Sequence, residues 1–297
     1  MTTQVLALQG NEALADALAA RIKGERGNVL VRNFPDGETF VRVEPDVKDN
    51  TVIIAATLFQ PDSVVMPLFF LASTLRELGA ARIILVTPYL AYMRQDKPFH
   101  AGEGTTARHF AHWLSSFLDG LITVDPHLHR IHSLSDVYDI PAINVASAPA
   151  ISAWLRQHYP NAVLIGPDAE SEQWVSEVAR NADCPFTVLE KTRHGDRDVS
   201  VSVPHIERWK NHTPVLLDDI ISTGHTMAAA AEHLRSAGMP PPVCIGVHAV
   251  FADNAFATLQ QADIGKLVTC NTIPHPSNGI DLHPLLADAL ETLLASA

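Results

Sequence analysis

The chain has 297 residues, and 21 Lys and Arg against 33 Asp and Glu give it a formal net charge of −12. This length suits one large or two ordinary domains. Hydrophobic residues make up 47%, enough for a sizeable core, which excludes an intrinsically disordered chain. The acidic balance argues against a nucleic-acid partner, because contacts to a phosphate backbone need clustered cations.

Cysteine usage and the N-terminal segment bear on where the protein works. Cys184, Cys244 and Cys270 lie far apart and form no CxxC pair, so we expect neither a disulfide framework nor a zinc ribbon, and a reducing compartment fits. The N-terminus has no basic head followed by an apolar run, and no stretch reaches the roughly 18 uncharged apolar residues of a membrane helix. We therefore expect a cytoplasmic protein with no membrane partner.

Short apolar runs alternate with helical patterns along nearly the whole chain. The runs are rich in Val and Ile or apolar at every residue, which is typical of strands buried on both faces of a parallel sheet. In chain order we expect a helix at 12–22, a β-hairpin at 28–44 with its turn at Pro35-Asp36-Gly37, a strand at 52–57, a helix at 63–78, a strand at 82–87, a helix at 105–118, strands at 121–124 and 162–165, a helix at 171–182, a polar and mobile hairpin tip at 192–198, a strand at 214–217, a helix at 226–237 and a strand at 243–250.

This alternation defines the fold class and the domains. It predicts an α/β architecture in which mainly parallel sheets are flanked by helices. A stretch near Ala146 precedes a new helical pattern and separates two halves of similar size. We therefore expect an N-terminal α/β domain at residues 1–145 and a C-terminal α/β domain at residues 146–297.

The most specific local pattern is VLLDDIISTGHT at residues 215–226, where a buried strand ends in Asp218 and Asp219 and a short turn leads into a helix. In such a unit the loop amides and the helix N-terminus point at one place and form an anion site. Gly224 allows close approach of the backbone. Hydroxyl groups come from Ser222, Thr223 and Thr226. The two carboxylates suit the hydroxyls of a sugar that carries the phosphate.

Simpler structural roles also explain parts of this segment. Each residue taken alone is explained by an ordinary helix N-cap, with the acids exposed at a strand end. The segment is not a Walker A loop, because the lysine of GxxxxGK[ST] is missing. The assembled pattern favours a sugar-phosphate site over a plain cap.

The loop resembles a known family. DD-x-x-S-T-G-x-T is similar to the ribose-phosphate loop of type I phosphoribosyltransferases and of ribose-phosphate pyrophosphokinases (PRPP synthetases), and Ser222 resembles their archaeal-type members. Three further segments resemble elements of the pyrophosphokinases in the same chain order: FPDGE at 34–38, PYLAYMRQDK at 88–97 and TVDPH at 123–127. The resemblance implies two type I phosphoribosyltransferase-like domains, each a mainly parallel sheet flanked by helices.

The resemblance also implies a reaction. Members of this family transfer the diphosphoryl group of Mg-ATP to the C1 hydroxyl of ribose 5-phosphate, giving PRPP and AMP. By this resemblance ribose 5-phosphate is bound by Asp218, Asp219, Ser222, Thr223, Gly224, His225 and Thr226. Contacts to ATP are implied for Phe34, Asp36, Glu38, Arg94 and Gln95. Adenine contacts from a neighbouring subunit imply a homo-oligomer, at least a dimer.

Catalytic and metal-associated residues are implied in the same way. Lys191 and Arg193 lie at the root of the expected mobile tip, and closure of that tip would bring cations to the diphosphoryl group and exclude water. An acidic protein that holds two polyanions together needs such local cations. His127 and Asp168 match the family's Mg²⁺-associated positions, and each follows a buried-type run.

Two alternatives stay open at the level of sequence. A phosphoribosyltransferase that consumes PRPP explains the loop at 218–226 but leaves the segments at 34–38 and 94–96 unexplained. A catalytically silent regulatory relative is favoured mildly by Thr192 and His225, which depart from the family pattern. Against it stand the retained Lys191, Arg193, His127 and Asp168.

Overall fold

The structure is a computed structural model that describes residues 2–98, 100–128, 130–167, 171–193, 199–204 and 206–296. The chain divides into two compact units. The first consists of Met1–Val145 together with Leu282–Ala297, and the second of Ala146–Asp281. None of the helices in the described part of the chain combines the length and the apolar content that crossing a lipid bilayer requires.

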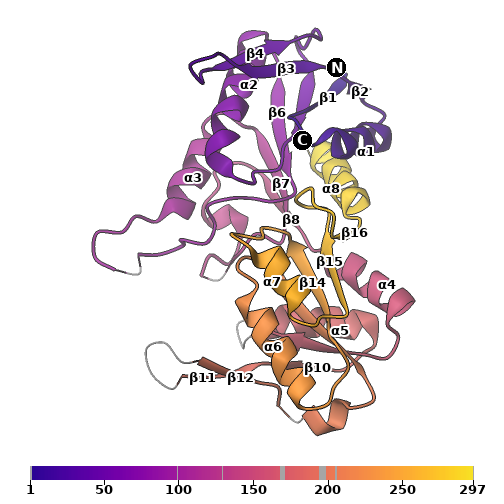
Figure 1. Ribbon diagram of the computed structural model, residues 1–297. Coiled ribbons are helices and arrows are strands. Elements are labelled where there is room, and N and C mark those ends of the chain that lie inside the picture. The colour runs from indigo at the N-terminus through magenta and orange to yellow at the C-terminus, as the bar shows by residue number, and fades with distance from the viewer. Residues whose placement is uncertain are drawn as a thin grey trace. The chain divides into compact units, whose positions relative to one another are not determined.

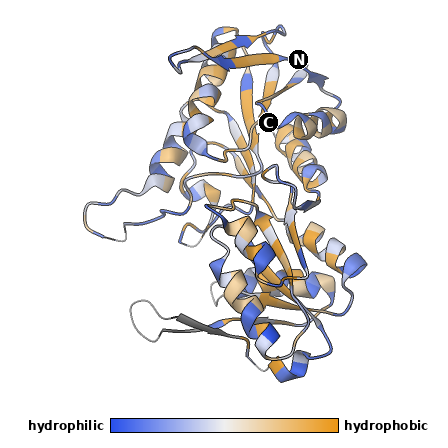
Figure 2. Ribbon diagram, in the orientation of Figure 1, coloured by the Kyte–Doolittle hydropathy of each residue, from blue (hydrophilic) through white to orange (hydrophobic). Residues whose placement is uncertain are grey.

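The first unit is built on a six-stranded parallel sheet in the order β2-β1-β5-β6-β7-β8 (Figure 1). Its central strands are fully buried, as the runs of Val, Ile and Leu predict, and they are mainly orange in Figure 2. The strands are β1 (Thr3–Ala7), β2 (Glu25–Arg26), β5 (Thr51–Ala55), β6 (Arg82–Thr87), β7 (Gly120–Val124) and β8 (Ala142–Val145).

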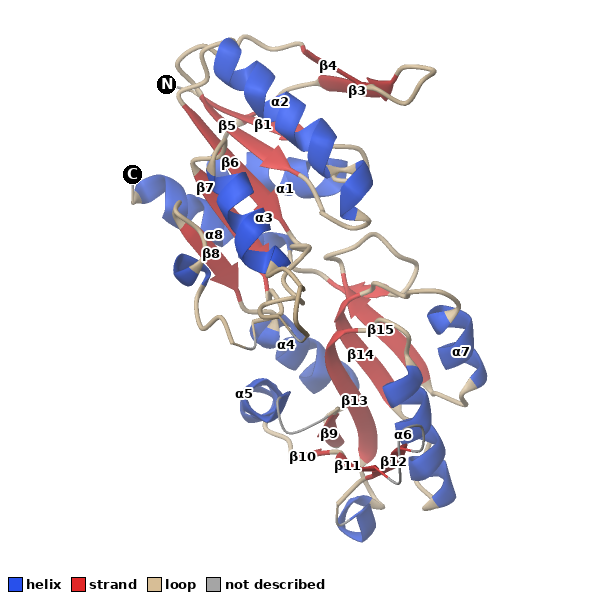
Figure 3. Cartoon of the chain, turned by 90° about the vertical axis from the view of Figure 1, so that its left-hand side faces the viewer, coloured by secondary structure: helices blue, strands red, loops and turns tan. Residues whose placement is uncertain are grey.

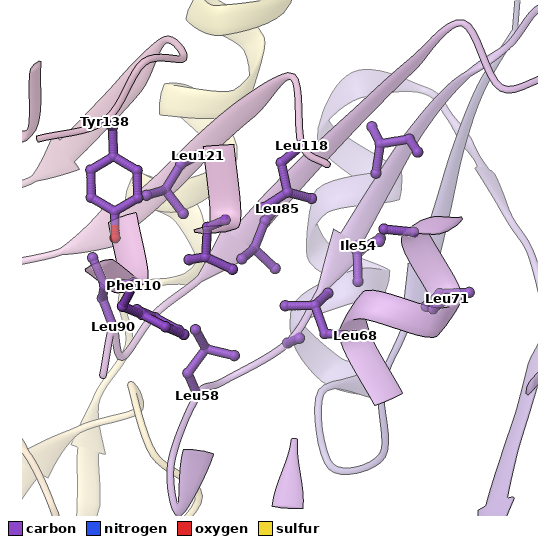
Figure 4. Packing of buried hydrophobic residues seen from close by; sticks show 14 of the residues in the cluster. Ile54, Leu58, Leu68, Leu71, Leu85, Leu90, Phe110, Leu118, Leu121 and Tyr138 are labelled. Carbon is purple, nitrogen blue, oxygen red and sulfur yellow. The ribbon is translucent and has the colours of Figure 1, made fainter. Parts of the chain in front are cut away.

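Helices cover both faces of this sheet, as an α/β sheet buried on both sides requires. On one face, Leu68 and Leu71 of α2 and Phe110 of α3 pack on Leu85 and the neighbouring strand residues (Figure 4). The opposite face carries α1 and α8, which lie side by side (Figure 1). The helices are α1 (Glu12–Ile22), α2 (Val65–Glu77), α3 (Thr106–Ser115) and α8 (His283–Ala295).

The position of α8 differs from the expected division of the chain. The sequence predicts that all of residues 146–297 belong to the second domain, whereas α8, at the C-terminus, belongs to the first unit. Its buried residues Leu286, Leu290 and Leu293 provide the apolar face that binds it there. Arg21 of α1 also forms ion pairs of 2.9 Å and 2.8 Å with Asp288 and Glu291 of α8.

A separate hairpin pairs β3 (Val29–Asn33) with β4 (Thr39–Val43) in antiparallel register, with Asn33 opposite Thr39. This confirms the hairpin expected around Pro35-Asp36-Gly37. The alternating valines of the two strands are partly buried against the core, and β4 packs on α2. The tip, residues 34–38, is exposed.

The second unit repeats the architecture with a six-stranded parallel sheet in the order β10-β9-β13-β14-β15-β16. Its strands are β9 (Ala162–Gly166), β10 (Phe186–Val188), β13 (Thr213–Ile220), β14 (Val243–His248), β15 (Lys266–Cys270) and β16 (Asn278–Ile280). Figure 3 shows α4 and α5 on one side of this sheet and α6 and α7 on the other. These helices are α4 (Ala148–His158), α5 (Glu172–Ala182), α6 (His225–Ser236) and α7 (Ala255–Gln261). Together the two units confirm the α/β class with parallel sheets flanked by helices.

Shorter elements complete the fold. A second antiparallel hairpin joins β11 (Glu190–Arg193) to β12 (Val199–Ser202). Residues 194–198, where we expected the centre of a mobile tip, lie outside the described residues. Single turns of 3-10 helix cover Pro61–Ser63, Leu134–Asp136 and Ile206–Trp209.

Candidate functional site

The loop between β13 and α6 is short and firmly held. It contains only residues 221–224, because β13 runs to Ile220 and α6 begins at His225. Ile221 is buried; its N–H donates to the carbonyl of His248 at 3.1 Å, and its own carbonyl accepts the N–H of Phe251 at 2.9 Å. The carbonyl of Ser222 accepts the N–H of Ala252 at 3.0 Å. The segment that follows β14 therefore fixes the loop backbone.

Gly224 shapes the entry to α6. Its φ of 72° lies in the left-handed region, and a Cβ at this position would lie 3.0 Å from Cγ of Leu259. Gly224 is also the N-cap residue of α6, and no side chain caps this helix. The first-turn amides of a helix have no partner within the helix, so this N-terminus suits an anion.

The two carboxylates of the loop have different surroundings. Asp218 and Thr226 line a small recess whose other walls are mainly apolar. Asp219 turns back on the chain, because its Oδ1 accepts the N–H of Ile220 at 2.8 Å. Both carboxylates are half-buried. Ser222 is half-buried, whereas Thr223 and His225 are exposed to solvent.

In the first unit, the segment at 88–97 follows the carboxyl end of β6 and is fixed along its length. Met93 is 1% exposed and belongs to the core, and the hydroxyl of Tyr92 donates to Asp62. This bond, together with burial and the nearby negative charge, raises the pKa of Tyr92 to about 12. Arg94 projects into solvent, whereas Oε1 of Gln95 accepts the hydroxyl of Thr106 at 3.2 Å. The amide NH₂ of Gln95 is thereby left as the group that can face a ligand.

The hairpin tip presents an aromatic ring and two acids. Phe34 is 40% exposed, and the guanidinium carbon of Arg32 lies 4.9 Å from its ring centroid. Three hydrogen bonds close the turn. The N–H of Phe34 donates to the carbonyl of Glu38 at 2.8 Å, the N–H of Gly37 to the carbonyl of Phe34 at 2.9 Å, and the N–H of Glu38 to Oδ1 of Asp36 at 3.2 Å. An exposed aromatic ring beside acceptor groups is the chemistry that an adenine base requires.

His127 is the part of the implied metal site that the structure describes. It is half-buried and follows β7, at the carboxyl edge of the first sheet, where α/β proteins gather ligands. Asp168 lies outside the described residues. Among the residues that are described, no group of three or more His, Cys, Asp or Glu can hold a metal ion. Mg²⁺ prefers oxygen ligands and is usually held by one or two carboxylates, several waters and phosphate oxygens, so it does not require a larger group of protein ligands.

Lys191 and Arg193 lie on β11, where their backbones pair with Val201 and Val199. The side chains of these two residues lie outside the part of the chain that the structure describes. Sequence reasoning missed the segment at 248–252, whose residues His248, Phe251 and Ala252 hold the loop after β13. It also gave no role to Asp96, which binds Arg130. No local pattern identifies the first of these, since its bonds are made by backbone atoms.

The fold and this loop together define a phosphoribosyltransferase-type α/β protein. In agreement, residues 133–285 match the family model of the phosphoribosyl transferase domain. Residues 3–117 match the model of the N-terminal domain of ribose phosphate pyrophosphokinase. A match in each half favours the pyrophosphokinase over a phosphoribosyltransferase alone.

Two curated relatives and one solved structure are similar to the chain over nearly its whole length. The chain is 33% identical over 292 residues to the ribose-phosphate pyrophosphokinase of Methanopyrus kandleri, an alignment that covers 97% of this chain and 99% of the relative. It is 32% identical over 288 residues to that of Halobacterium salinarum, covering 96% and 100%. The fold matches the crystal structure of phosphoribosylpyrophosphate synthetase from Mycobacterium smegmatis over 100% of both chains, with a TM-score of 0.85 and 24% identity. The chain belongs to the ribose-phosphate pyrophosphokinase family, and the expected class of enzyme is confirmed.

Proposed function

We propose that this chain binds Mg-ATP and ribose 5-phosphate and transfers the β,γ-diphosphoryl group to the C1 hydroxyl. The C1 oxygen attacks the β-phosphorus, the bond between that phosphorus and the α,β-bridging oxygen breaks, and AMP leaves. The proton of the hydroxyl is lost, and PRPP is the second product. The proposal is supported by the loop after β13, where two carboxylates border an uncapped helix N-terminus, in a chain whose residues 3–117 match the N-terminal domain of ribose phosphate pyrophosphokinase.

In this proposal ribose 5-phosphate binds at the loop after β13. The amides at the start of α6 and the hydroxyls of Ser222, Thr223 and Thr226 bind the 5-phosphate. Asp218, which lines the recess, accepts hydrogen bonds from the ribose hydroxyls. The exposed imidazole of His225 stands at the rim, where it adds positive charge only when it is protonated.

ATP is bound by residues of the first unit. Arg94 is free to swing over phosphate or base, since it is exposed, and Gln95 offers its NH₂ to the purine edge. The adenine of the ATP bound to a second copy of the chain contacts Phe34, Asp36 and Glu38. The working protein is therefore at least a dimer. Light scattering after gel filtration would test this, and a strictly monomeric active enzyme would refute it.

His127 and Asp168 are the residues that would hold Mg²⁺, which when bound supplies charge neutralisation at the phosphate oxygens. Lys191 and Arg193 are proposed to stabilise the charge that develops on the transferring group. A cytoplasmic location accords with three cysteines that remain free thiols.

One assay tests the reaction. Purified protein is mixed with ATP, Mg²⁺ and ribose 5-phosphate and followed by ³¹P NMR. AMP with a C1 diphosphate supports the proposal, whereas pyrophosphate release only from PRPP and a base supports a phosphoribosyltransferase. Binding without turnover supports a silent relative. Lys191→Ala should lower kcat by several orders of magnitude without weakening ATP binding, and unchanged kcat would remove Lys191 from the mechanism.

A further inference from the structure

Asp96 completes the sequence Arg94-Gln95-Asp96, and the proposed function gives it no role. Its side chain is only 4% exposed. A buried carboxylate costs free energy unless hydrogen-bond donors compensate it. Arg130 provides two such donors. Its backbone N–H donates to Oδ2 of Asp96 at 3.1 Å, and its Nη1 donates to Oδ1 at 3.2 Å.

These bonds join two segments that leave neighbouring strands. Asp96 lies in the segment after β6, and Arg130 lies in the segment after β7, three residues beyond His127. The two strands pair in parallel, so both segments emerge at the same edge of the sheet. The carbonyl of Gln95 accepts the N–H of Ala107 at 3.2 Å, which fixes the first segment to α3 as well.

We propose that Asp96 is a positioning residue that, through Arg130, sets the segment carrying His127 against the segment carrying Arg94 and Gln95. The inference rests on the proposed function, because it assigns those segments to one substrate, Mg-ATP. Movement of either segment would break a charge-assisted hydrogen bond to the buried carboxylate of Asp96, whose partner Arg130 is partly exposed. Misplacement of a substrate-binding group by about 1 Å is enough to lower a rate about a hundredfold.

The chain offers a matched control in Asp119. One of its carboxylate oxygens accepts the N–H of Ile83 at 2.7 Å and Nη2 of Arg76 at 2.6 Å, so it also joins a backbone amide to a guanidinium. Asp119 immediately precedes β7 and therefore lies at the opposite end of that strand from His127. Substitution of Asp119 tests what loss of such a link does to the fold alone.

The kinetic experiment compares Asp96→Ala, Asp96→Asn, Arg130→Met and Asp119→Ala with the unaltered chain. Asp96→Ala should raise the KM for Mg-ATP about tenfold, which corresponds to one lost charge-assisted bond. The KM for ribose 5-phosphate should not change. Asp96→Asn should have a smaller effect, because its amide oxygen still accepts the N–H of Arg130. Adding Arg130→Met to Asp96→Asn should cause no loss beyond that of Arg130→Met alone.

A second readout does not depend on turnover. Amide hydrogen exchange at Arg130, measured without nucleotide or metal, should be faster in Asp96→Ala and unchanged in Asp119→Ala. The inference would be overturned if Asp96→Ala and Asp119→Ala changed the KM values for Mg-ATP and ribose 5-phosphate equally. It would also be overturned if exchange at Arg130 were unchanged in Asp96→Ala. A native chain that forms no AMP would instead refute the proposed function, and the exchange measurement would still decide whether Asp96 fixes Arg130.

Discussion

Gly224→Ala tests how the loop after β13 depends on a single backbone geometry. The φ of 72° costs a residue with a Cβ about 1–2 kcal/mol. The added carbon would also lie 3.0 Å from Cγ and 3.1 Å from Cδ1 of Leu259, closer than the ordinary contact of about 3.5–4.0 Å. Leu259 is fully buried, so relief requires movement of α7 or of the loop itself. Overpacking of this kind adds about 1–3 kcal/mol.

Gly238→Ala is the matched control, since Gly238 follows the other end of the same helix. Its φ is 75°, and a Cβ there would meet nothing within 4 Å. It therefore shares the backbone cost of about 1–2 kcal/mol but lacks the contact cost. The difference between the two variants in urea-induced unfolding measures the contact with Leu259.

The functional assay is the KM for ribose 5-phosphate at saturating Mg-ATP. A displaced loop loses at least one charge-assisted bond to phosphate, worth about 1.5–3 kcal/mol, so Gly224→Ala should raise this KM tenfold or more. Gly238→Ala should leave it unchanged. If both variants have the same KM, the left-handed glycine is not what positions the phosphate cradle, and the reasoning fails.

Three further outcomes are expected. Asp218→Asn should raise the KM for ribose 5-phosphate about tenfold and spare that for ATP, and an equal change in both would contradict a role at the sugar hydroxyls. Phe34→Ala should raise the KM for ATP several-fold while changing the free energy of unfolding by less than about 1 kcal/mol, because the ring is 40% exposed. Tyr92→Phe bears on pH dependence. The pKa of Tyr92 is raised from 10.0 to about 12, mainly by its hydrogen bond to Asp62. The contribution of the protonated Tyr92 hydroxyl to folding stability is therefore complete below pH 10 and is lost as the pH rises through 12. Unfolding measured between pH 10 and 12 should therefore show the native chain losing its advantage over Tyr92→Phe, and parallel curves would refute this.

Several parts of the fold follow from local patterns. Continuous apolar runs identify the central strands β5, β6, β7, β9, β13 and β14, because strands buried on both faces tolerate few polar residues. The pattern is weaker for β16, which has three residues and a glycine and pairs through a register shift. The apolar run at 243–250 predicts a strand that ends at residue 250, whereas β14 ends at His248. The apolar run continues beyond it because Ala249 is also buried.

The sequence by itself determined which groups belong to the loop after β13, since a strand, a turn and a helix N-terminus lie within twelve consecutive residues and their geometry is local. It also determined the order of the motifs that indicate the family. It did not determine that α8 joins the first unit, or that Asp96 meets Arg130, 34 residues further along the chain. Hydrophobic periodicity records whether a residue is buried, but not which distant segment covers it. That choice depends on strand order and on the complementarity of packed faces, which exist only in the folded protein.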